Sequence, residues 1–95
     1  MPHYIILGNF TEQGIKNVRQ APKRDEEARR MIEEAGGKMQ VYYTLGEYDF
    51  VAITEMPDDE SMMRFLLQAG SLGNVRTKTL KAWTESDSTK VISQL

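Results

Sequence analysis

The 95-residue sequence contains no cysteine and a single histidine, His3. Without cysteine, the chain has no disulfide, no thiolate metal site and no cysteine nucleophile. One histidine leaves little for a multi-histidine metal site or a Ser-His catalytic triad. We therefore expect neither a metal nor a cofactor. Because a chain this short buries only roughly 60–70% of the surface exposed on unfolding, we expect self-association to reinforce its thin core.

The sequence also lacks a long apolar run and an excess of charge of one sign. No run approaches the roughly 20 residues of a membrane-spanning helix, and no charged segment followed by an apolar one marks a signal peptide. The 12 basic and 14 acidic residues give a net charge of −2, whereas a nucleic-acid-binding surface needs a basic excess. We expect a cytoplasmic protein without nucleic-acid or membrane partners.

The apolar patterns that are present predict four strands and two main helices. In the first helix Ala28, Met31, Ile32 and Ala35 follow the spacing of one buried helix face. Thr84 can cap a short last helix, so we divide the chain into one domain, residues 1–84, and a short C-terminal helix or arm, residues 85–95. The strands are expected at residues 3–10, 38–45, 48–56 and 74–84, and the helices begin at Pro22 and near Asp58 and end near Gly36 and Gly70.

The second and third strands are predicted to form a hairpin around Gly46-Glu47, because glycine suits the first central position of a type II′ turn. That turn places Tyr43 opposite Phe50 and Val41 opposite Ala52. Opposed residues share a face, so this face is largely apolar. The other face is half polar.

The order β-α-β-β-α-β predicts a ferredoxin-like α+β fold. Right-handed crossovers give an antiparallel four-stranded sheet, with the strands in the order 4-1-3-2 and both helices on one face. The first and third strands nevertheless carry apolar residues on both sides. We therefore expect a homodimer, or a higher oligomer, formed through the helix-free face of the sheet.

Three sequence runs resemble the GYD-domain family: Gly46–Asp49, Gly70–Thr79 and Asn9–Asn17. The resemblance extends from about Met1 to Thr84, and the second run is its most specific part. It implies a small, mostly bacterial or archaeal stand-alone domain that is similar to dimeric α+β barrels, and it implies no established activity. Proteins of that architecture include small monooxygenases, isomerases and effector-binding domains, so the fold does not choose among these functions.

The predicted topology brings several polar residues to one rim of the sheet. We interpret the rim as the polar mouth of an apolar pocket, where Arg76 binds an anionic group and Tyr48 and Asp49 supply hydrogen bonds or a proton. In the alternative interpretation, Asp49 pins the hairpin or pairs structurally with Arg76. The candidate ligand-binding residues are Asn9, Thr44, Tyr48, Asp49, Asn74 and Arg76.

Two other features invite a functional interpretation. Histidine is the side-chain type whose unperturbed pKa lies near neutral pH, so His3 could act as a base beside Glu55, Lys81 or Trp83, but a polar residue at a strand start is the simpler interpretation. The Gly70–Gly73 loop is glycine-rich like a phosphate-binding loop. However, it precedes a strand and does not open a helix, so it is better explained as a tight turn.

We favour a small-ligand-binding or assembly module that is not an enzyme. The alternative is a small cofactor-independent enzyme, similar to a monooxygenase or isomerase, that acts on an aromatic or acidic metabolite. A third hypothesis is a structural oligomer in which residues 85–95 form the interaction arm.

Overall fold

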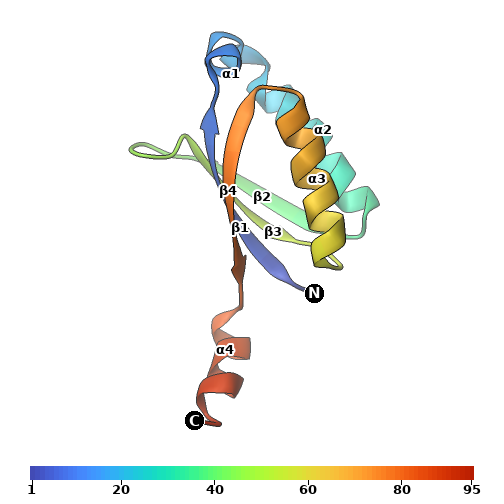
Figure 1. Cartoon of the computed structure of the whole chain (residues 1–95), viewed down its shortest axis with the longest axis vertical. Helices are drawn as coiled ribbons and strands as arrows, with labels where there is room; N and C mark the ends of the chain where they lie inside the picture. Colours follow the sequence, from blue (N-terminus) through green and yellow to red (C-terminus); the bar gives the residue numbers. More distant parts are fainter.

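The computed structural model describes all residues, 1–95. Its strands form one antiparallel sheet in the order β2-β3-β1-β4, and α2 and α3 cover one face of that sheet (Figure 1). The predicted ferredoxin-like α+β fold and strand order are therefore confirmed. The elements are β1 (His3–Phe10), α1 (Glu12–Lys16), η1 (Val18–Gln20), α2 (Ala21–Glu34), β2 (Lys38–Tyr43), β3 (Phe50–Glu55), α3 (Asp59–Ser71), β4 (Val75–Ala82) and α4 (Glu85–Ile92).

The hairpin register is confirmed, since Tyr43 pairs with Phe50 and Val41 pairs with Ala52. The strands are shorter than predicted, because regular pairing stops at Tyr43 and Phe50. Beyond them the Thr44 hydroxyl donates to a backbone carbonyl of the turn, at 2.6 Å. Gly46 has a φ of +107°, a conformation that glycine adopts without steric cost.

Helix α2 begins at Ala21, one residue before the predicted start at Pro22. Proline fits the first helical turn because the N–H group that it lacks has no partner there. After the helix ends, Gly36 adopts a φ of +94°, the left-handed conformation expected of a glycine at this position. Of the predicted stripe, Ile32 is fully buried against the sheet and Ala28 is half-buried, whereas Met31 and Ala35 are exposed.

Helix α3 begins after Asp58, whose carboxylate accepts a hydrogen bond from the Ser61 N–H at 2.8 Å. This bond satisfies one of the N–H groups that every helix start leaves free. The apolar inner face of α3 joins α2 and the sheet in one core. The buried core residues are Tyr4, Ile6, Ile32, Ala52, Met56, Met62 and Phe65.

The opposite face of the sheet has no second layer, and we call it the open face. It includes Ile5 and Leu7 of β1, and it exposes Tyr42 (49%), Ile53 (44%) and Leu80 (52%). Only 12 of the 95 residues are buried in the single chain, so the core is thin. Self-association through the open face stays a prediction.

The C-terminal helix α4 extends away from the sheet (Figure 1), and none of its residues is buried. The Thr84 hydroxyl caps it as expected, by accepting a hydrogen bond from the Asp87 N–H at 3.1 Å. No helix in the structure has the length and apolar character needed to cross a membrane. The predicted cytoplasmic location stays a prediction.

Candidate functional site

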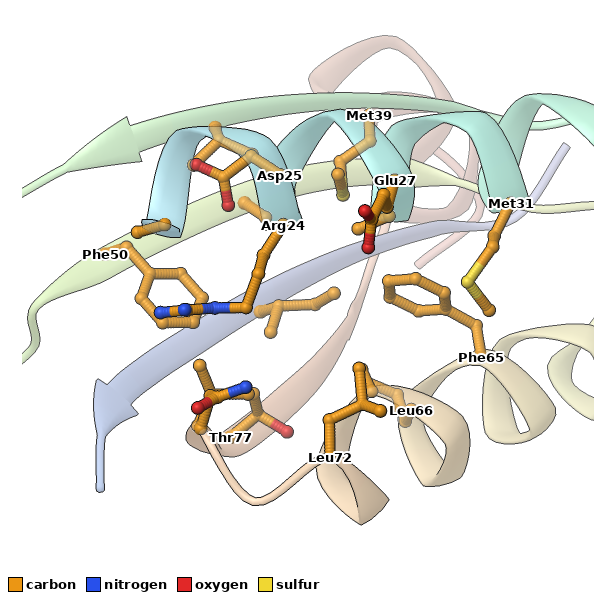
Figure 2. Close-up of a pocket in the computed structure, with 18 of the residues that line it drawn as sticks. Arg24, Asp25, Glu27, Met31, Met39, Phe50, Phe65, Leu66, Leu72 and Thr77 are labelled. Carbon is orange, nitrogen blue, oxygen red and sulfur yellow. The ribbon is translucent and has the colours of Figure 1, made fainter. Parts of the chain in front are cut away.

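A cavity of about 400 Å³ lies between the sheet and the two helices α2 and α3. Figure 2 shows α2 on one side of this space and α3 on the other, with strands behind them. Most of the 22 lining residues are apolar, 15 in all, so the cavity favours an apolar occupant. The apolar lining residues include Phe10, Met31, Met39, Val41, Phe50, Phe65, Leu66 and Leu72.

Two phenylalanine rings form part of the cavity wall, and glycine makes room for one of them. The rings of Phe10 and Phe50 lie with their centroids 5.8 Å apart. The Phe50 ring lies over Gly8, where an added Cβ would come within 2.0 Å of the ring. A side chain at position 8 would therefore displace this ring.

Arg24 is the one basic residue among those that line this cavity. Figure 2 shows its side chain extending from α2 into the space, with the guanidinium group turned towards Phe50 in this view. Its Nη1 donates to the Asn17 carbonyl at 3.3 Å, whereas Nη2 is buried and has no hydrogen-bond partner. A buried, charged donor without a partner is costly, and an oxygen atom from a ligand would remove that cost.

Tyr43 and Asp25 form a second polar group in the cavity lining. The Tyr43 hydroxyl donates a hydrogen bond to the Asp25 carboxylate. Burial, followed by this hydrogen bond and the negative charge of Asp25, raises the pKa of Tyr43 to about 12. Tyr43 is therefore protonated at neutral pH, where it acts as a hydrogen-bond donor and not as a base.

Among the predicted rim residues, Asp49 and Thr44 bind the protein's own backbone. The Asp49 carboxylate accepts from the Phe10 N–H at 2.9 Å, and the Asp49 N–H donates to the Gly8 carbonyl at 2.9 Å. Thr44 donates to the Tyr48 carbonyl at 2.6 Å. These bonds hold the hairpin against β1, the structural role given above as the alternative for Asp49.

The other predicted residues are divided between two hollows. Asn9, Tyr48 and Arg76 line a second hollow of about 830 Å³ at the end of the sheet, where Asn9 and Arg76 are register partners. Asn74 lines the apolar cavity instead. No ion pair joins Arg76 to Asp49. The six residues therefore do not converge on one cavity, and their role in ligand binding stays a prediction.

Two of the sequence runs noted above meet in space. Thr11, from the run Asn9–Asn17, donates its N–H to the carbonyl of Asn74 in the run Gly70–Thr79, at 3.0 Å. An added Cβ at Gly14 would lie 1.9 Å from the same carbonyl oxygen, so only glycine allows this approach. Gly70 lies in the last turn of α3, and residues 72–74 form the tight turn into β4 that packs against α1.

His3 lies at the opposite end of β1 from Asn9, with its Nε2 atom 3.6 Å from the Glu55 carboxylate. Glu55 is one of the three neighbours that we considered for it. Nowhere in the structure do three or more His, Asp or Glu side chains gather closely enough to hold a metal ion.

The sequence analysis missed Arg24. A signal for it was available, because Arg24 lies four residues before Ala28 and seven before Met31. It therefore continues the buried face of α2 by one turn towards the N-terminus. A charged residue on an otherwise apolar helix face marks a position where the charge is turned inwards.

Comparison with known proteins finds relatives that match about nine-tenths of the chain. A protein of Thermus thermophilus, named glutamine synthetase and cystathionine beta-lyase binding protein, is 35% identical over 89 residues, or 92% of this chain and 94% of the relative. A crystal structure of TTHA0845, also from Thermus thermophilus, is similar as well, with a TM-score of 0.56 and 27% identity, covering 88% of this chain and 95% of that one.

A crystal structure of MtbAldR superposes with a TM-score of 0.69 at 18% identity, which shows the fold alone. The match covers 88% of this chain but 54% of that one, so this chain spans about half of MtbAldR. The family model for the GYD domain matches residues 4–92, which include α4 as well as the sheet and its helices. The chain therefore belongs to the GYD-domain family.

Proposed function

We propose that the protein is a small-ligand-binding domain whose ligand occupies the cavity between the sheet and helices α2 and α3. The cavity carries this proposal. Its volume of about 400 Å³ falls within the ~300–1,000 Å³ common among ligand sites. Protein interiors are normally close-packed, and an unfilled cavity lowers stability. A domain with so few buried residues gains from an occupant that restores those contacts.

Filling the cavity with a larger side chain tests the proposal. Ala69 lines the cavity on α3, so Ala69→Leu should remove binding of the neutral probe 3-phenylpropionamide, followed by amide shifts in NMR titrations. Ala82→Leu makes the same change at the end of β4, away from the cavity, and should bind as the wild type does. Equal binding by both variants would contradict the proposal, and so would a wild type that shows saturable binding of neither this amide nor the corresponding acid.

The predicted rim residues enter this proposal through Asn74, which lines the cavity. Asp49→Asn tests whether Asp49, which binds the protein's own backbone, also takes part in ligand binding. Unchanged affinity for the same probe would remove Asp49 from the ligand site. A lower melting temperature with unchanged affinity would assign it to the hairpin alone.

We also propose that the domain is a homodimer through the open face. The support is the set of apolar side chains exposed there, among them Tyr42, Ile53 and Leu80. Contiguous exposed apolar patches on small domains often mark interaction sites. Size-exclusion chromatography with light scattering should give twice the mass of the chain, and a stable monomer at micromolar concentration would reject the dimer.

The name of the Thermus thermophilus relative favours a second function, which is the binding of an enzyme partner. If the open face is taken by a second copy, apolar side chains remain exposed on the outer side of α3, namely Met63 and Leu67. We propose this surface for the partner. The test is biolayer interferometry against purified glutamine synthetase and cystathionine beta-lyase from the chain's own source.

Leu67→Lys should weaken such binding, because it places a charge in an apolar contact. Arg30→Gln, on the exposed side of the other helix, serves as the control and should bind like the wild type. If neither enzyme binds the wild-type chain, this second function is rejected while the ligand proposal is unaffected.

A further inference from the structure

We infer that the ligand of the cavity is a small carboxylate with an apolar, preferably aromatic body, and that Arg24 binds its carboxylate group. This inference rests on the proposed function and adds the chemical class of the ligand to it. Three observations carry it: the hydrogen bonds of Arg24, the carboxylates nearby and the composition of the cavity wall.

The guanidinium group of Arg24 is only partly satisfied by the protein. Arginine carries five N–H donors and is always charged in proteins. The protein supplies one acceptor, the Asn17 carbonyl, 3.3 Å from Nη1, and leaves the buried Nη2 without a partner. The missing acceptor has to come from the cavity that this side chain lines.

No carboxylate of the protein forms an ion pair with Arg24. Asp25 lines the same cavity, but its carboxylate accepts the hydrogen bond of Tyr43. Glu27 also lines the cavity, yet it is exposed and forms no ion pair with Arg24. The positive charge is therefore available to a ligand anion, and a carboxylate matches the two parallel donors of a guanidinium group.

The remainder of the wall selects the body of the ligand. Rings come from Phe10, Phe50 and Phe65, and flexible thioethers come from Met31 and Met39. Aromatic rings pack well against other rings, and methionine adapts to irregular apolar shapes. Figure 2 shows Met31, Met39 and Phe65 around the space that Arg24 enters. This arrangement fits a ring with a short acidic side chain.

The test compares two probes that differ only in charge, 3-phenylpropionate and 3-phenylpropionamide, by NMR titration at neutral pH. A charge-assisted hydrogen bond is worth about 1.5–3 kcal/mol, and 1.4 kcal/mol is a tenfold change in affinity. The wild type should therefore bind the acid at least about tenfold more tightly than the amide. Arg24→Gln should bring this ratio close to one, mainly by lowering the affinity for the acid.

Two further variants make the result specific to this side chain. Arg30→Gln removes one positive charge from the same helix outside the cavity and should keep the wild-type ratio. Arg24→Lys keeps the charge without the paired donors and should give an intermediate ratio.

The outcomes separate the inference from the proposed function. If the amide binds in the cavity but Arg24→Gln leaves the ratio unchanged, the inference is overturned and the ligand site stands. If neither probe binds the wild type, the proposed function fails and the inference fails with it.

Discussion

At the scale of single residues, the buried hydroxyl of Thr54 lowers the stability of the fold. It is 1% exposed, and its hydroxyl is buried without a hydrogen-bond partner. Burying such a group without a partner costs about 1–3 kcal/mol. Valine has nearly the same shape and no hydroxyl. We therefore expect Thr54→Val to raise the free energy of unfolding by about 1 kcal/mol or more, as measured by urea denaturation.

Thr79→Val is the matched control for this substitution. Thr79 lies in β4, is half-buried, and does not have a buried hydroxyl without a partner, so the control includes any gain from the higher strand preference of valine. If Thr54→Val raises the free energy of unfolding no more than Thr79→Val does, burial of the Thr54 hydroxyl does not destabilise the fold.

A second residue-scale prediction concerns Asp59, which connects α3 to β1 and β4. Its carboxylate accepts hydrogen bonds from the Tyr4 hydroxyl and from Lys81, the latter at 2.9 Å. The bond from Tyr4, followed by that from Lys81, lowers the pKa of Asp59 below its usual 3.8. Because the pKa is lower in the folded state, this stabilisation is complete well above pH 3.8 and is lost as the pH falls through the lowered value.

Urea denaturation at pH 6 and at pH 3 measures this loss. Asp59→Asn removes the titrating group and should reduce the difference in unfolding free energy between the two pH values. Asp25→Asn, which breaks the other tyrosine–aspartate pair, is a control. If the unfolding free energy of Asp59→Asn depends on pH as strongly as that of the wild type, the lowered pKa of Asp59 contributes nothing to stability.

At the scale of secondary-structure elements, α4 differs from the others. Helices α2 and α3 bury Ile32, Met62 and Phe65 in the core, whereas α4 buries no residue. An element that buries little apolar surface contributes little to the stability of the remaining fold. We expect a chain that ends at Thr84 to keep its melting temperature within a few degrees of the full chain.

Light scattering on the shortened chain tests the role of the arm. Loss of a larger assembly with the dimer intact would support the hypothesis that residues 85–95 join dimers. A fall of more than about 10 °C in melting temperature, about 1–2 kcal/mol or more for a domain of this size, would show instead that α4 stabilises the domain.

At the scale of the whole molecule, the thin core and the open face predict that stability depends on association. A partner that binds only the folded state stabilises it in proportion to the logarithm of its concentration. The melting temperature should therefore rise when the protein concentration is raised a hundredfold.

Charged substitutions show which surface is responsible. Ile53→Lys on the open face should remove the concentration dependence, because it places a charge in the dimer contact. Leu67→Lys makes the same kind of change at an exposed leucine on α3 and should leave the dependence unchanged. The reverse pattern would move the dimer contact to the helices.

Local physical rules were sufficient to predict much of the fold. A glycine at the first position of a two-residue turn set the hairpin register, which pairs Tyr43 with Phe50. The helical spacing identified the face of α2 on which Ala28 and Ile32 pack against the core, and the strand order followed from connection rules. Each of these features depends on neighbours in the chain or on general chirality, which a sequence displays directly.

The candidate site depended on contacts that the sequence does not display. The sequence left Asp49 open as a ligand contact or as a residue that pins the hairpin, and the structure adds that its carboxylate accepts a hydrogen bond from the Phe10 N–H of β1. Arg24 was overlooked because only the packing of α2 over the sheet turns its guanidinium group inwards.

The sequence by itself therefore determined the elements, their pairing and the face that each presents, because these follow from periodicity and turn chemistry. The tertiary structure decided where the two helices leave about 400 Å³ unfilled and that one buried arginine nitrogen there has no partner. Volume and satisfied hydrogen bonds are properties of atoms brought together from distant parts of the chain, so only the folded protein defines them.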